Sequence, residues 1–503
     1  MKRFLSTAAL LLALSSVVPS WAADTPIDIG SRREVFIDNF MIDSMKNVEL
    51  KMHEPVRRNI ALNFDKPWEG CGCNYFTVFQ DGDKFRMYYH GWQIRLKDST
   101  YPQHPLVMTY AESKDGIEWT RPNLGLFEFQ GSKDNNIVLP DIKGTECHDF
   151  APFIDLNPKA EPDAKYKAIG TVYGIKPAGL WAFKSPDAIH WTPMKDAAVY
   201  TQGAFDTQNI AFWSEHEQKY ILYYRVFAEG VRHIERAVSD DFLNWTREGL
   251  LDFGDGAPTM TEQFYVNQIK PYYRAPHISI GFPARYVDRG LTASTYELPE
   301  PEYRKQRVAT TPRYGTAFTD TVLITSRDGK KFQRSNDAFL RPGLRTKNNW
   351  SYGDNYIAWH VIETAPTDDD MPRELSLFAT ESYFTENNSR LRRYTLRIDG
   401  FVSAHAKHDL GELITKTFTF AGKRLSLNFG TSAAGVLKIE IQDADGKPIP
   451  GFTETDADLL YGDSLDRTAS WKGNGDVSSL AGKPIRMRFV MNETDVYSWK
   501  FEN

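Results

Sequence analysis

Short runs of alternating polar and apolar residues, rich in β-branched and aromatic side chains, recur along the chain, and Gly, Asp, Asn and Pro separate them. This pattern is typical of β-structure, because a strand turns successive side chains to opposite faces and tight turns require those four residue types. Apolar positions at the 3.6-residue helical spacing are hard to find. The sequence therefore predicts an all-β fold of the sandwich, barrel or propeller type.

One local unit, Ser-x-Asp-x-x-x-aromatic, occurs four times in the chain. The copies span residues 113–119, 185–191, 239–245 and 326–332. An Asp in the third place suits a tight turn, because its carboxylate can accept hydrogen bonds from the backbone amides that follow it. An apolar run precedes each copy, so we predict that each unit forms the outer hairpin of a small sheet.

A second repeat interleaves with the first and consists of five strand-like runs. They span residues 84–89, 165–170, 219–225, 277–282 and 374–379. Small sheets that repeat in this way predict a five-bladed β-propeller, with residues 34–38 adding the strand that closes the ring. The copies of the first unit are unevenly spaced and require a long insertion at 290–315, which leaves an irregular array of β-sandwiches as the alternative.

The two ends of the chain differ from its middle. Residues 418–429, 436–441 and 485–490 alternate cleanly between Asp-Gly and Ala-Gly turns, which predicts a C-terminal β-sandwich. Lys2 and Arg3 precede an apolar run and small residues around Ala22, a pattern typical of a cleaved signal peptide. The predicted division is a signal peptide over 1–22, a propeller over 23–402 and a sandwich over 403–503.

A cleaved signal peptide predicts a secreted or periplasmic protein, with a buried N-terminal helix or an uncleaved anchor as alternatives. No apolar run is long enough to predict a membrane span. The net charge is −6 and Lys and Arg do not cluster, so a nucleic acid is not an expected partner. The three cysteines, Cys71, Cys73 and Cys147, are too few for a disulfide framework, and neither a metal site nor a cofactor is predicted from them.

Polar side chains recur where the innermost strand of each predicted blade begins. They are Glu69, Asn74 and Tyr75 in blade 1, His148 and Asp149 in blade 2, Asp206 and Asn209 in blade 3, Glu262, Tyr265 and Asn267 in blade 4, and Asp354 and Asn355 in blade 5. A single Asp at a strand start is usually a turn residue. Five polar sets that converge on one axis lose hydration unless they bind something, so we predict a ligand site there.

Cleavage of a glycosidic bond suits this arrangement. It needs one carboxylic acid to protonate the leaving oxygen and a second carboxylate to activate water or attack the sugar. We assign Glu262 as the general acid, Asp149 as the general base and Asp206 as the residue that orients them, with Glu69 as the alternative to either partner. An aromatic content of 13% suits both stacking on an oligo- or polysaccharide and the core of a propeller.

Further candidate binding residues flank these positions. They are Arg274, His277 and Arg285 around blade 4, with Trp359, Trp92 and Trp350 as stacking platforms. The arginines either hold a carboxylate or sulfate group of the sugar or pair with the ring acids. His148 is the candidate ligand for a structural metal ion on the axis.

With these features the chain resembles the five-bladed propeller glycoside hydrolases of families 43, 32, 62, 68 and 117. The resemblance covers residues 30–400 and rests on the Ser-x-Asp-x-x-x-Trp units, the Asp81-Gly82 hairpin and the strand start at Asp149-Phe-Ala-Pro. Segments 30–38 and 66–70 also resemble a set of secreted proteins from polysaccharide-degrading bacteria. Family 43 implies an Asp base on blade 1, an Asp modulator on blade 2 and a Glu acid on blade 3, with inversion of configuration.

The chain departs from that pattern in two blades. Asp149 fits the second-blade Asp, but Asn74-Tyr75 and Gln208-Asn209 occupy the places of the family's base and acid. Either other ring carboxylates take over these roles, or catalysis is lost. The sequence therefore predicts an exported glycoside hydrolase acting on a plant or algal glycan. A non-catalytic sugar-binding propeller and a polysaccharide lyase with Tyr, His and Arg near a uronate are the alternatives.

Overall fold

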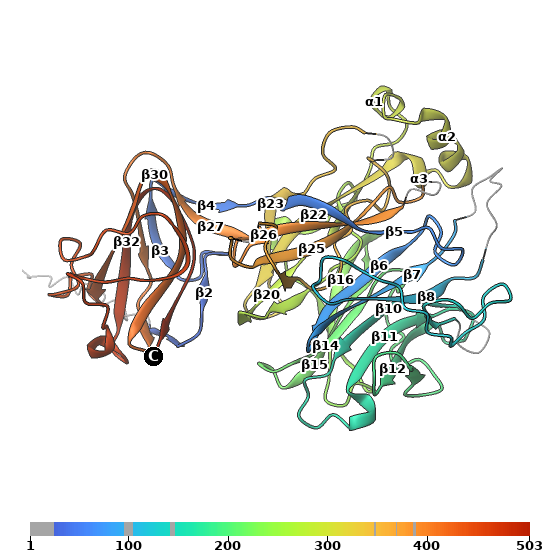
Figure 1. The fold of residues 1–503 in the computed structure, drawn as a ribbon, viewed down its shortest axis with the longest axis horizontal. Helices are drawn as coiled ribbons and strands as arrows, with labels where there is room; N and C mark the ends of the chain where they lie inside the picture. The colour runs from blue at the N-terminus through green and yellow to red at the C-terminus, as the bar shows by residue number, and fades with distance from the viewer. Residues whose placement is uncertain (1–24, 95–103, 141–145, 347–348, 369, 386–388) are drawn as a thin grey trace, which may run out of the picture.

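The computed structural model describes residues 25–503, apart from 95–103, 141–145, 347–348, 369 and 386–388. Five sheets surround a common axis and form a β-propeller, and a ten-stranded sheet folds into a second β-domain beside it (Figure 1). The predicted all-β class and the five blades are confirmed. The predicted signal peptide lies outside the described residues.

Blades 1 to 3 are antiparallel sheets of four strands in sequence order. Blade 1 is β6 (Asn74–Asp81), β7 (Lys84–Gly91), β8 (Val107–Ser113) and β9 (Ile137–Leu139). Blade 2 is β10 (Cys147–Ile154), β11 (Tyr166–Val172), β12 (Gly179–Ser185) and β13 (Thr192–Pro193). Blade 3 is β14 (Ile210–Ser214), β15 (Lys219–Ala228), β16 (Val231–Ser239) and β17 (Thr246–Leu250).

Blade 4 is built from interrupted strands. Its innermost edge is β18 (Gln263–Phe264) and β19 (Lys270–Tyr272), followed outward by β20 (Ala275–Gly281) with β21 (Ala284–Asp288), then β22 (Ala317–Ser326) and β23 (Gln333–Leu340). Blade 5 is β24 (Ile362–Thr364), β25 (Glu374–Glu381), β26 (Arg390–Arg397) and β5 (Val56–Asn63). The first strand of the propeller thus completes the last blade, which closes the ring.

The prediction that residues 34–38 close the ring was wrong. β5 makes this closure by pairing antiparallel with β26, whereas β2 (Glu34–Val35) pairs with β32 (Ile485–Glu502) in the other sheet. Ion pairs also connect the 34–38 segment to the 326–332 hairpin of blade 4, because Arg327 contacts the carboxylates of both Glu34 and Asp38. Closure by an N-terminal strand was predicted correctly, but the strand that provides it lies one segment later in the sequence.

The Ser-x-Asp units form the outer hairpins that the sequence predicts. In the first copy, the Asp115 carboxylate accepts hydrogen bonds from the amides of Ile117 (2.8 Å) and Glu118 (2.9 Å), and the Ser113 hydroxyl accepts one from Gly116 (2.8 Å). The same bonds recur in the other three copies. Each unit joins the third strand of a blade to the fourth.

Both ends of the chain contribute to the second domain. Its sheet contains β1 (Ile27–Gly30), β2, β3 (Ile42–Lys46), β4 (Val48–Met52), β27 (Val402–Ala406), β28 (Gly411–Thr415), β29 (Phe418–Phe420), β30 (Arg424–Asp443), β31 (Asp463–Thr468) and β32. Apolar side chains from both ends share one core, including Phe36, Leu427 and Trp499. The boundary predicted at 402–403 did not include the N-terminal strands.

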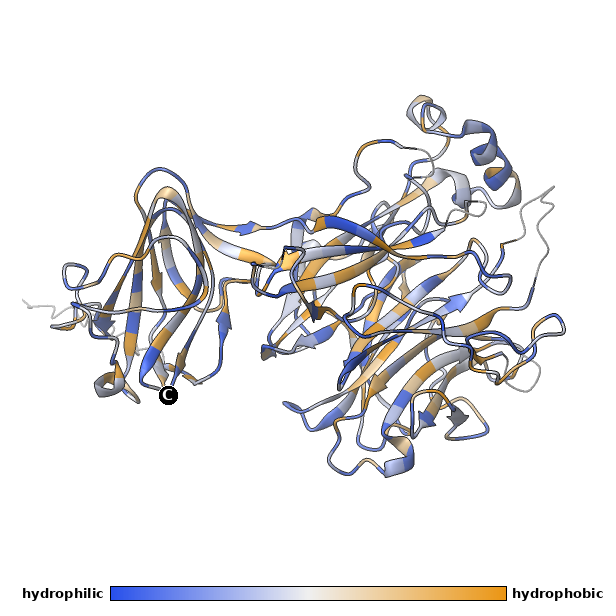
Figure 2. Cartoon of the chain, in the orientation of Figure 1, coloured by the Kyte–Doolittle hydropathy of each residue, from blue (hydrophilic) through white to orange (hydrophobic). Residues whose placement is uncertain are grey.

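Three short helices are inserted between β21 and β22, within the long connection predicted at 290–315. They are α1 (Ala293–Tyr296), α2 (Pro301–Thr310) and α3 (Arg313–Thr316), and they lie at one end of the propeller (Figure 1). Helix α2 is mostly hydrophilic (Figure 2), and Tyr303 on it donates a hydrogen bond to the Phe384 carbonyl. The remaining helical turns are η1 (Pro162–Ala164), η2 (Gly254–Gly256) and η3 (Ser478–Leu480). Among the described residues, no helix has the length and apolar character needed to cross a membrane.

Candidate functional site

The innermost strands of three blades begin with an irregular backbone. Tyr75, Asp149 and Asn355 have φ angles of +56°, +57° and +62°. The pairing of β6 with β7 and of β10 with β11 shifts at this point, as in a β-bulge. Residues other than Gly rarely adopt a positive φ, and backbone strain of this kind is concentrated at ligand sites. We call the end of the axis marked by these three residues the strand-start mouth.

Two glutamine side chains lie between the strand-start mouth and the opposite end of the axis. Gln208 donates hydrogen bonds to the Tyr75 carbonyl and the Thr77 hydroxyl, both at 3.0 Å. Gln268 donates to the Gln208 side-chain oxygen (2.7 Å) and to the Ile357 carbonyl (2.9 Å). Both glutamines are buried. Their network joins four of the five blades across the axis.

Two of the three predicted catalytic carboxylates lie at the strand-start mouth. Asp149 is buried, contacts the ring of His148 and accepts a hydrogen bond from the Thr171 hydroxyl (2.6 Å). The same hydroxyl lies 3.0 Å from the carbonyl of Phe205, the residue before Asp206. Asp206 is exposed and forms no hydrogen bond or ion pair with any residue that the structure describes. Thr171 therefore links the buried carboxylate to the segment that carries the free one.

Glu262 is engaged elsewhere in blade 4. Its carboxylate accepts a hydrogen bond from Arg334 on β23 (2.5 Å) and lies 3.5 Å from Arg285 on β21. The hydrogen bond from Arg334 is the main cause that holds the pKa of Glu262 below its usual value, and the Arg285 charge adds to it. A general acid needs the opposite shift, so this pairing opposes the role predicted for Glu262.

Glu69, the predicted alternative, is held inside blade 1. Its carboxylate accepts hydrogen bonds from Tyr89 (2.6 Å) and Arg121 (2.6 Å), and the side chain is fully buried. Burial raises its pKa, which the Arg121 charge opposes. These contacts leave Glu69 with a structural role.

The predicted residues around blade 4 also pair with acids of the fold. Arg274 donates to Asp399 (2.9 Å), the His277 ring lies 3.2 Å from Glu34, and Arg285 donates to Asp320 (2.6 Å). Both arginines are thus paired with carboxylates, but of the predicted ring acids only Glu262 takes part, at 3.5 Å from Arg285. Trp359 is fully buried and its indole N–H donates to the Ile269 carbonyl (3.2 Å), so it is a core residue, and its prediction as a stacking platform was wrong.

The remaining predicted residues hold the backbone of the mouth. Asn74 accepts from the Tyr75 amide, Asn209 donates to the Phe205 and Thr207 carbonyls, Asn267 donates to the Tyr223 carbonyl, and Asn355 donates to the Thr319 carbonyl. Asp354 accepts hydrogen bonds from the amides of Ser351 and Tyr383, and burial raises its pKa to about 7. These side chains shape the mouth without presenting free groups to it.

Three arginines that the sequence analysis missed surround Tyr265. The guanidinium carbons of Arg225 and Arg232 each lie 5.2 Å from the centre of the Tyr265 ring. Arg313 lies 3.3 Å from the hydroxyl of Tyr352, which donates to the Tyr265 hydroxyl (3.0 Å). Arg225 and Arg232 donate to neutral oxygens. Within the described part of the protein, none of the three arginines forms an ion pair with a carboxylate.

The arginines act on the tyrosine between them. Burial and the Asp206 charge push the pKa of Tyr265 upward, Arg225 and Arg313 push it downward, and the net direction is downward. Burial raises the pKa of the neighbouring Tyr75 well above its usual value. Tyr265 is thus the tyrosine of the mouth whose pKa the neighbouring arginines lower.

A sequence signal for one of the missed residues, Arg225, existed near the end of a second strand, whereas Arg232 on β16 and Arg313 on α3 had no such signal. Each second strand runs antiparallel to the innermost strand, so its C-terminal end returns to the strand-start mouth. His90, Thr171 and Arg225 occupy these ends in β7, β11 and β15. These strands were predicted, but only the starts of the innermost strands were predicted to carry site residues.

The described residues offer little for a metal ion. No group of three or more His, Cys, Asp or Glu side chains among them is arranged to hold one. Burial lowers the pKa of His148, the predicted axial ligand, to about 3, and the Arg225 charge adds to the shift. Cys71, Cys73 and Cys147 are buried free thiols.

Comparisons with known proteins give no close relative. A scan against protein-family models finds no match, and a search of curated proteins finds no similar sequence. Among solved structures, one described as a complex of BT0996 and RGII is 14% identical, with 69% of this protein and 93% of that one covered and a TM-score of 0.43.

Two further solved structures are described as acting on glycosidic bonds. The GH32 β-fructofuranosidase of Bombyx mori is 9% identical, with 90% of this protein and 94% of that one covered and a TM-score of 0.41. A structure from the GH130 family of mannoside phosphorylases and hydrolases is 12% identical, with 69% and 94% covered and a TM-score of 0.40. All these TM-scores lie below 0.5, and none of the likenesses identifies a function for this protein.

Proposed function

We propose that this protein cleaves glycosidic bonds of an anionic carbohydrate at the strand-start mouth. The observation that carries the proposal is the set of Arg225, Arg232 and Arg313, which have no carboxylate partner among the described residues and lie around Tyr265. Guanidinium groups that have lost hydration favour an anionic partner, and their planar fork matches a carboxylate or sulfate group. A uronate or sulfated sugar supplies such a group.

Hydrolysis is the reaction that the two carboxylates support. Asp206 is exposed and unpaired among the described residues, so it is the group that can reach a water molecule or the anomeric carbon. Asp149 lies on the neighbouring blade, and we assign it the protonation of the leaving oxygen. This assignment differs from the sequence prediction, because Glu262 is occupied by two arginines.

Tyr265 supports a second candidate reaction, β-elimination at a uronate. In that reaction a base removes the proton next to the carboxylate, and positive charges stabilise the carbanion that forms. Tyr265, whose pKa is lowered, is the candidate base, and Arg225 and Arg313 beside it supply the positive charges. Elimination leaves a double bond in the product and hydrolysis does not, so the products distinguish the two reactions.

The test uses the purified mature protein with polyuronates, sulfated galactans and neutral xylan or arabinan as substrates. New reducing ends and ultraviolet absorbance of the unsaturated product are measured together. We expect reducing ends from an anionic substrate without the absorbance, and a fall of about 100-fold or more in Asp206→Asn and Asp149→Asn. The matched control is Glu262→Gln, which should keep its activity.

The same experiment separates the alternatives. Absorbance that Tyr265→Phe abolishes would replace hydrolysis by elimination. Equal activity on neutral and anionic glycans in the wild type and in Arg225→Gln would refute the proposed role of the arginines. Binding of a glycan without formation of any product would favour the third alternative, a non-catalytic carbohydrate-binding propeller.

A further inference from the structure

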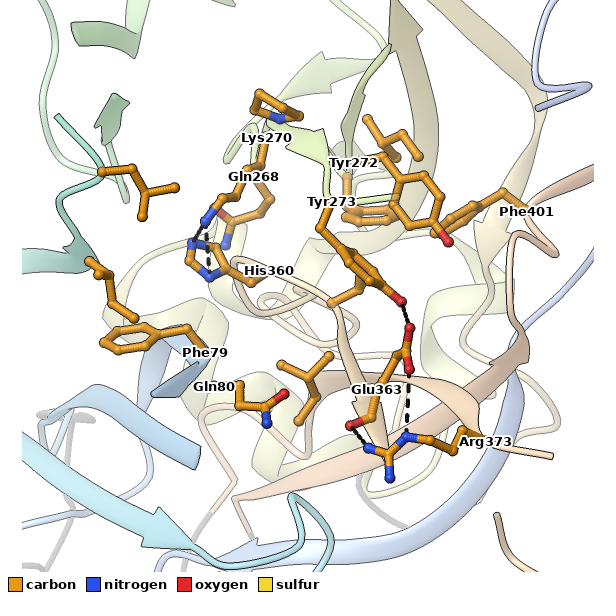
Figure 3. Close-up of a pocket in the computed structure, with 17 residues that line it drawn as sticks. Phe79, Gln80, Gln268, Lys270, Tyr272, Tyr273, His360, Glu363, Arg373 and Phe401 are labelled. Atoms are coloured by element: carbon orange, nitrogen blue, oxygen red, sulfur yellow. Dashed lines mark hydrogen bonds and ion pairs between the residues drawn. The ribbon is translucent and has the colours of Figure 1, made fainter. Parts of the chain in front are cut away.

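The opposite end of the propeller axis contains a cavity of about 440 Å³. The ends of the innermost strands of blades 1, 2, 4 and 5 line it, and we call it the strand-end cavity (Figure 3). Its walls are largely apolar and include Phe79, Ile154, Tyr272, Ile280 and Phe282. The hydrogen-bonded pair of Gln208 and Gln268 lies between this cavity and the strand-start mouth, so the two sites are separate.

One unpaired cation lies in this apolar cavity. The ammonium nitrogen of Lys270 is 3.0 Å from Nε2 of His360 and 5.4 Å from the centre of the Trp359 ring. No carboxylate among the described residues forms an ion pair with Lys270. Burial lowers the pKa of Lys270 to about 7, and burial together with the Lys270 charge lowers that of His360 well below its usual value.

The nearest acid in the lining is already engaged. Glu363 accepts a hydrogen bond from Tyr273, lies 3.5 Å from Arg373 and lies 3.8 Å from Arg274. Figure 3 shows Tyr273, Glu363 and Arg373 grouped on one side of the cavity, with Lys270 and His360 facing one another on the other side. The positive charge of Lys270 therefore has no counter-ion within the described protein.

We propose that the strand-end cavity binds an organic carboxylate with a flat apolar body, whose carboxylate pairs with Lys270. An ammonium group that has lost part of its hydration beside a neutral imidazole is stabilised by an anion. The aromatic and aliphatic walls favour a ligand whose remaining surface is apolar. The proposal does not depend on carbohydrate cleavage, because it uses no residue of the strand-start mouth.

Binding of such a ligand depends on pH in a defined direction. The carboxylate pairs with the ammonium form of Lys270, so the affinity is greatest below pH 7 and falls about tenfold for each pH unit above it. The other titratable groups that line the cavity are His360, Tyr272, Tyr273, Glu363 and Arg373. Tyr272 donates to Asp399 and Glu363 is paired, so neither offers a second free charge.

Isothermal titration calorimetry of the full mature protein with benzoate tests the proposal, and benzamide serves as the neutral probe of the same shape. We expect benzoate to bind at pH 6 at least tenfold more tightly than benzamide, and to bind about tenfold more weakly at pH 8. Lys270→Met should remove the preference for benzoate, whereas Lys270→Arg should keep it. Asp206→Asn should bind benzoate like the wild type, which separates this site from the strand-start mouth.

Three results would overturn the proposal. They are no benzoate binding by the wild type at millimolar concentration, equal affinities for benzoate and benzamide, and unchanged benzoate binding in Lys270→Met. If Lys270→Met does not fold, the comparison of benzoate with benzamide in the wild type at the two pH values still decides the question. Binding of hexanoate as tight as that of benzoate would contradict the flat shape assigned to the ligand.

Discussion

Replacing Lys270 by Met should stabilise the protein, and the gain should shrink as the pH rises. Lys270 contacts His360 and the Trp359 ring, and burial lowers its pKa from 10.5 to about 7. Met has a flexible side chain of similar length without a charge. The substitution therefore keeps the contact with Trp359 and removes a charge that lost part of its hydration on folding.

The size of the gain follows from the shift in pKa. Each unit of pKa difference corresponds to about 1.4 kcal/mol, so the shift of Lys270 corresponds to about 5 kcal/mol at most. Lys270 is only partly removed from solvent, and water reduces the effect, so we expect the free energy of unfolding to rise by about 2–3 kcal/mol at pH 6. Above pH 7 the folded protein releases this proton, while the unfolded chain keeps it until about pH 10. Wild-type stability therefore rises with pH in that window, relative to the variant.

Urea unfolding followed by tryptophan fluorescence at pH 6, 7, 8 and 9 measures this difference. The control is Lys305→Met, because Lys305 is an exposed residue of α2 that pairs with Glu302. The reasoning would be refuted by a Lys270→Met variant that is less stable than the wild type at pH 6. A difference between the two proteins that stays the same from pH 6 to pH 9 would refute it as well.

Three further substitutions test the fold. Asp399→Asn should lower the free energy of unfolding by about 3 kcal/mol, because the buried carboxylate accepts hydrogen bonds from Arg274 and Tyr272 of blade 4 and from Ser498 of β32. Urea unfolding measures this loss, and an unchanged free energy of unfolding would show that the junction is not stabilising. Leu62→Ala on β5 should lower the free energy of unfolding by about 2–4 kcal/mol, because it leaves a cavity around a buried side chain, and should make the ring more sensitive to proteolysis. Val56→Ala, at the exposed end of the same strand, is the control and should have little effect. Asp241→Ala should lower the free energy of unfolding by about 1 kcal/mol, because its carboxylate accepts hydrogen bonds from two backbone amides in a Ser-x-Asp turn. An equal loss in Asp240→Ala would contradict that cause.

Local chemistry was predictable from the sequence. The four Ser-x-Asp turns depend on hydrogen bonds between residues two or three positions apart, and the number of blades follows from the second repeat of five strand-like runs. Ring closure was assigned to the wrong segment, because β5 and β26 are separated by more than 300 residues and both N-terminal segments are plausible strands. Alternation along one strand does not reveal which distant edge it pairs with.

The surroundings of the candidate residues followed from the sequence only in part. Asp149 and Asp206 lie at the strand-start mouth as predicted, whereas Glu262 pairs with Arg334. A shift of one residue turns a side chain to the other face of a strand, and the interrupted innermost edge of blade 4 makes that position hard to assign. Arg225 was missed because it ends a second strand, and only the antiparallel pairing returns it to the mouth.

The arrangement of the two termini has a consequence for biosynthesis. β1 to β4 leave the ribosome first, yet their partners β27 to β32 are made last, and β5 must wait for β26. The propeller can close once β26 (Arg390–Arg397) has emerged, whereas the second domain has to wait for β32 at the end of the chain. β1 to β4 therefore spend almost the whole of translation with unpaired edges, which is a hazard for aggregation. A protein truncated at residue 402 would leave β1 to β4 permanently without partners.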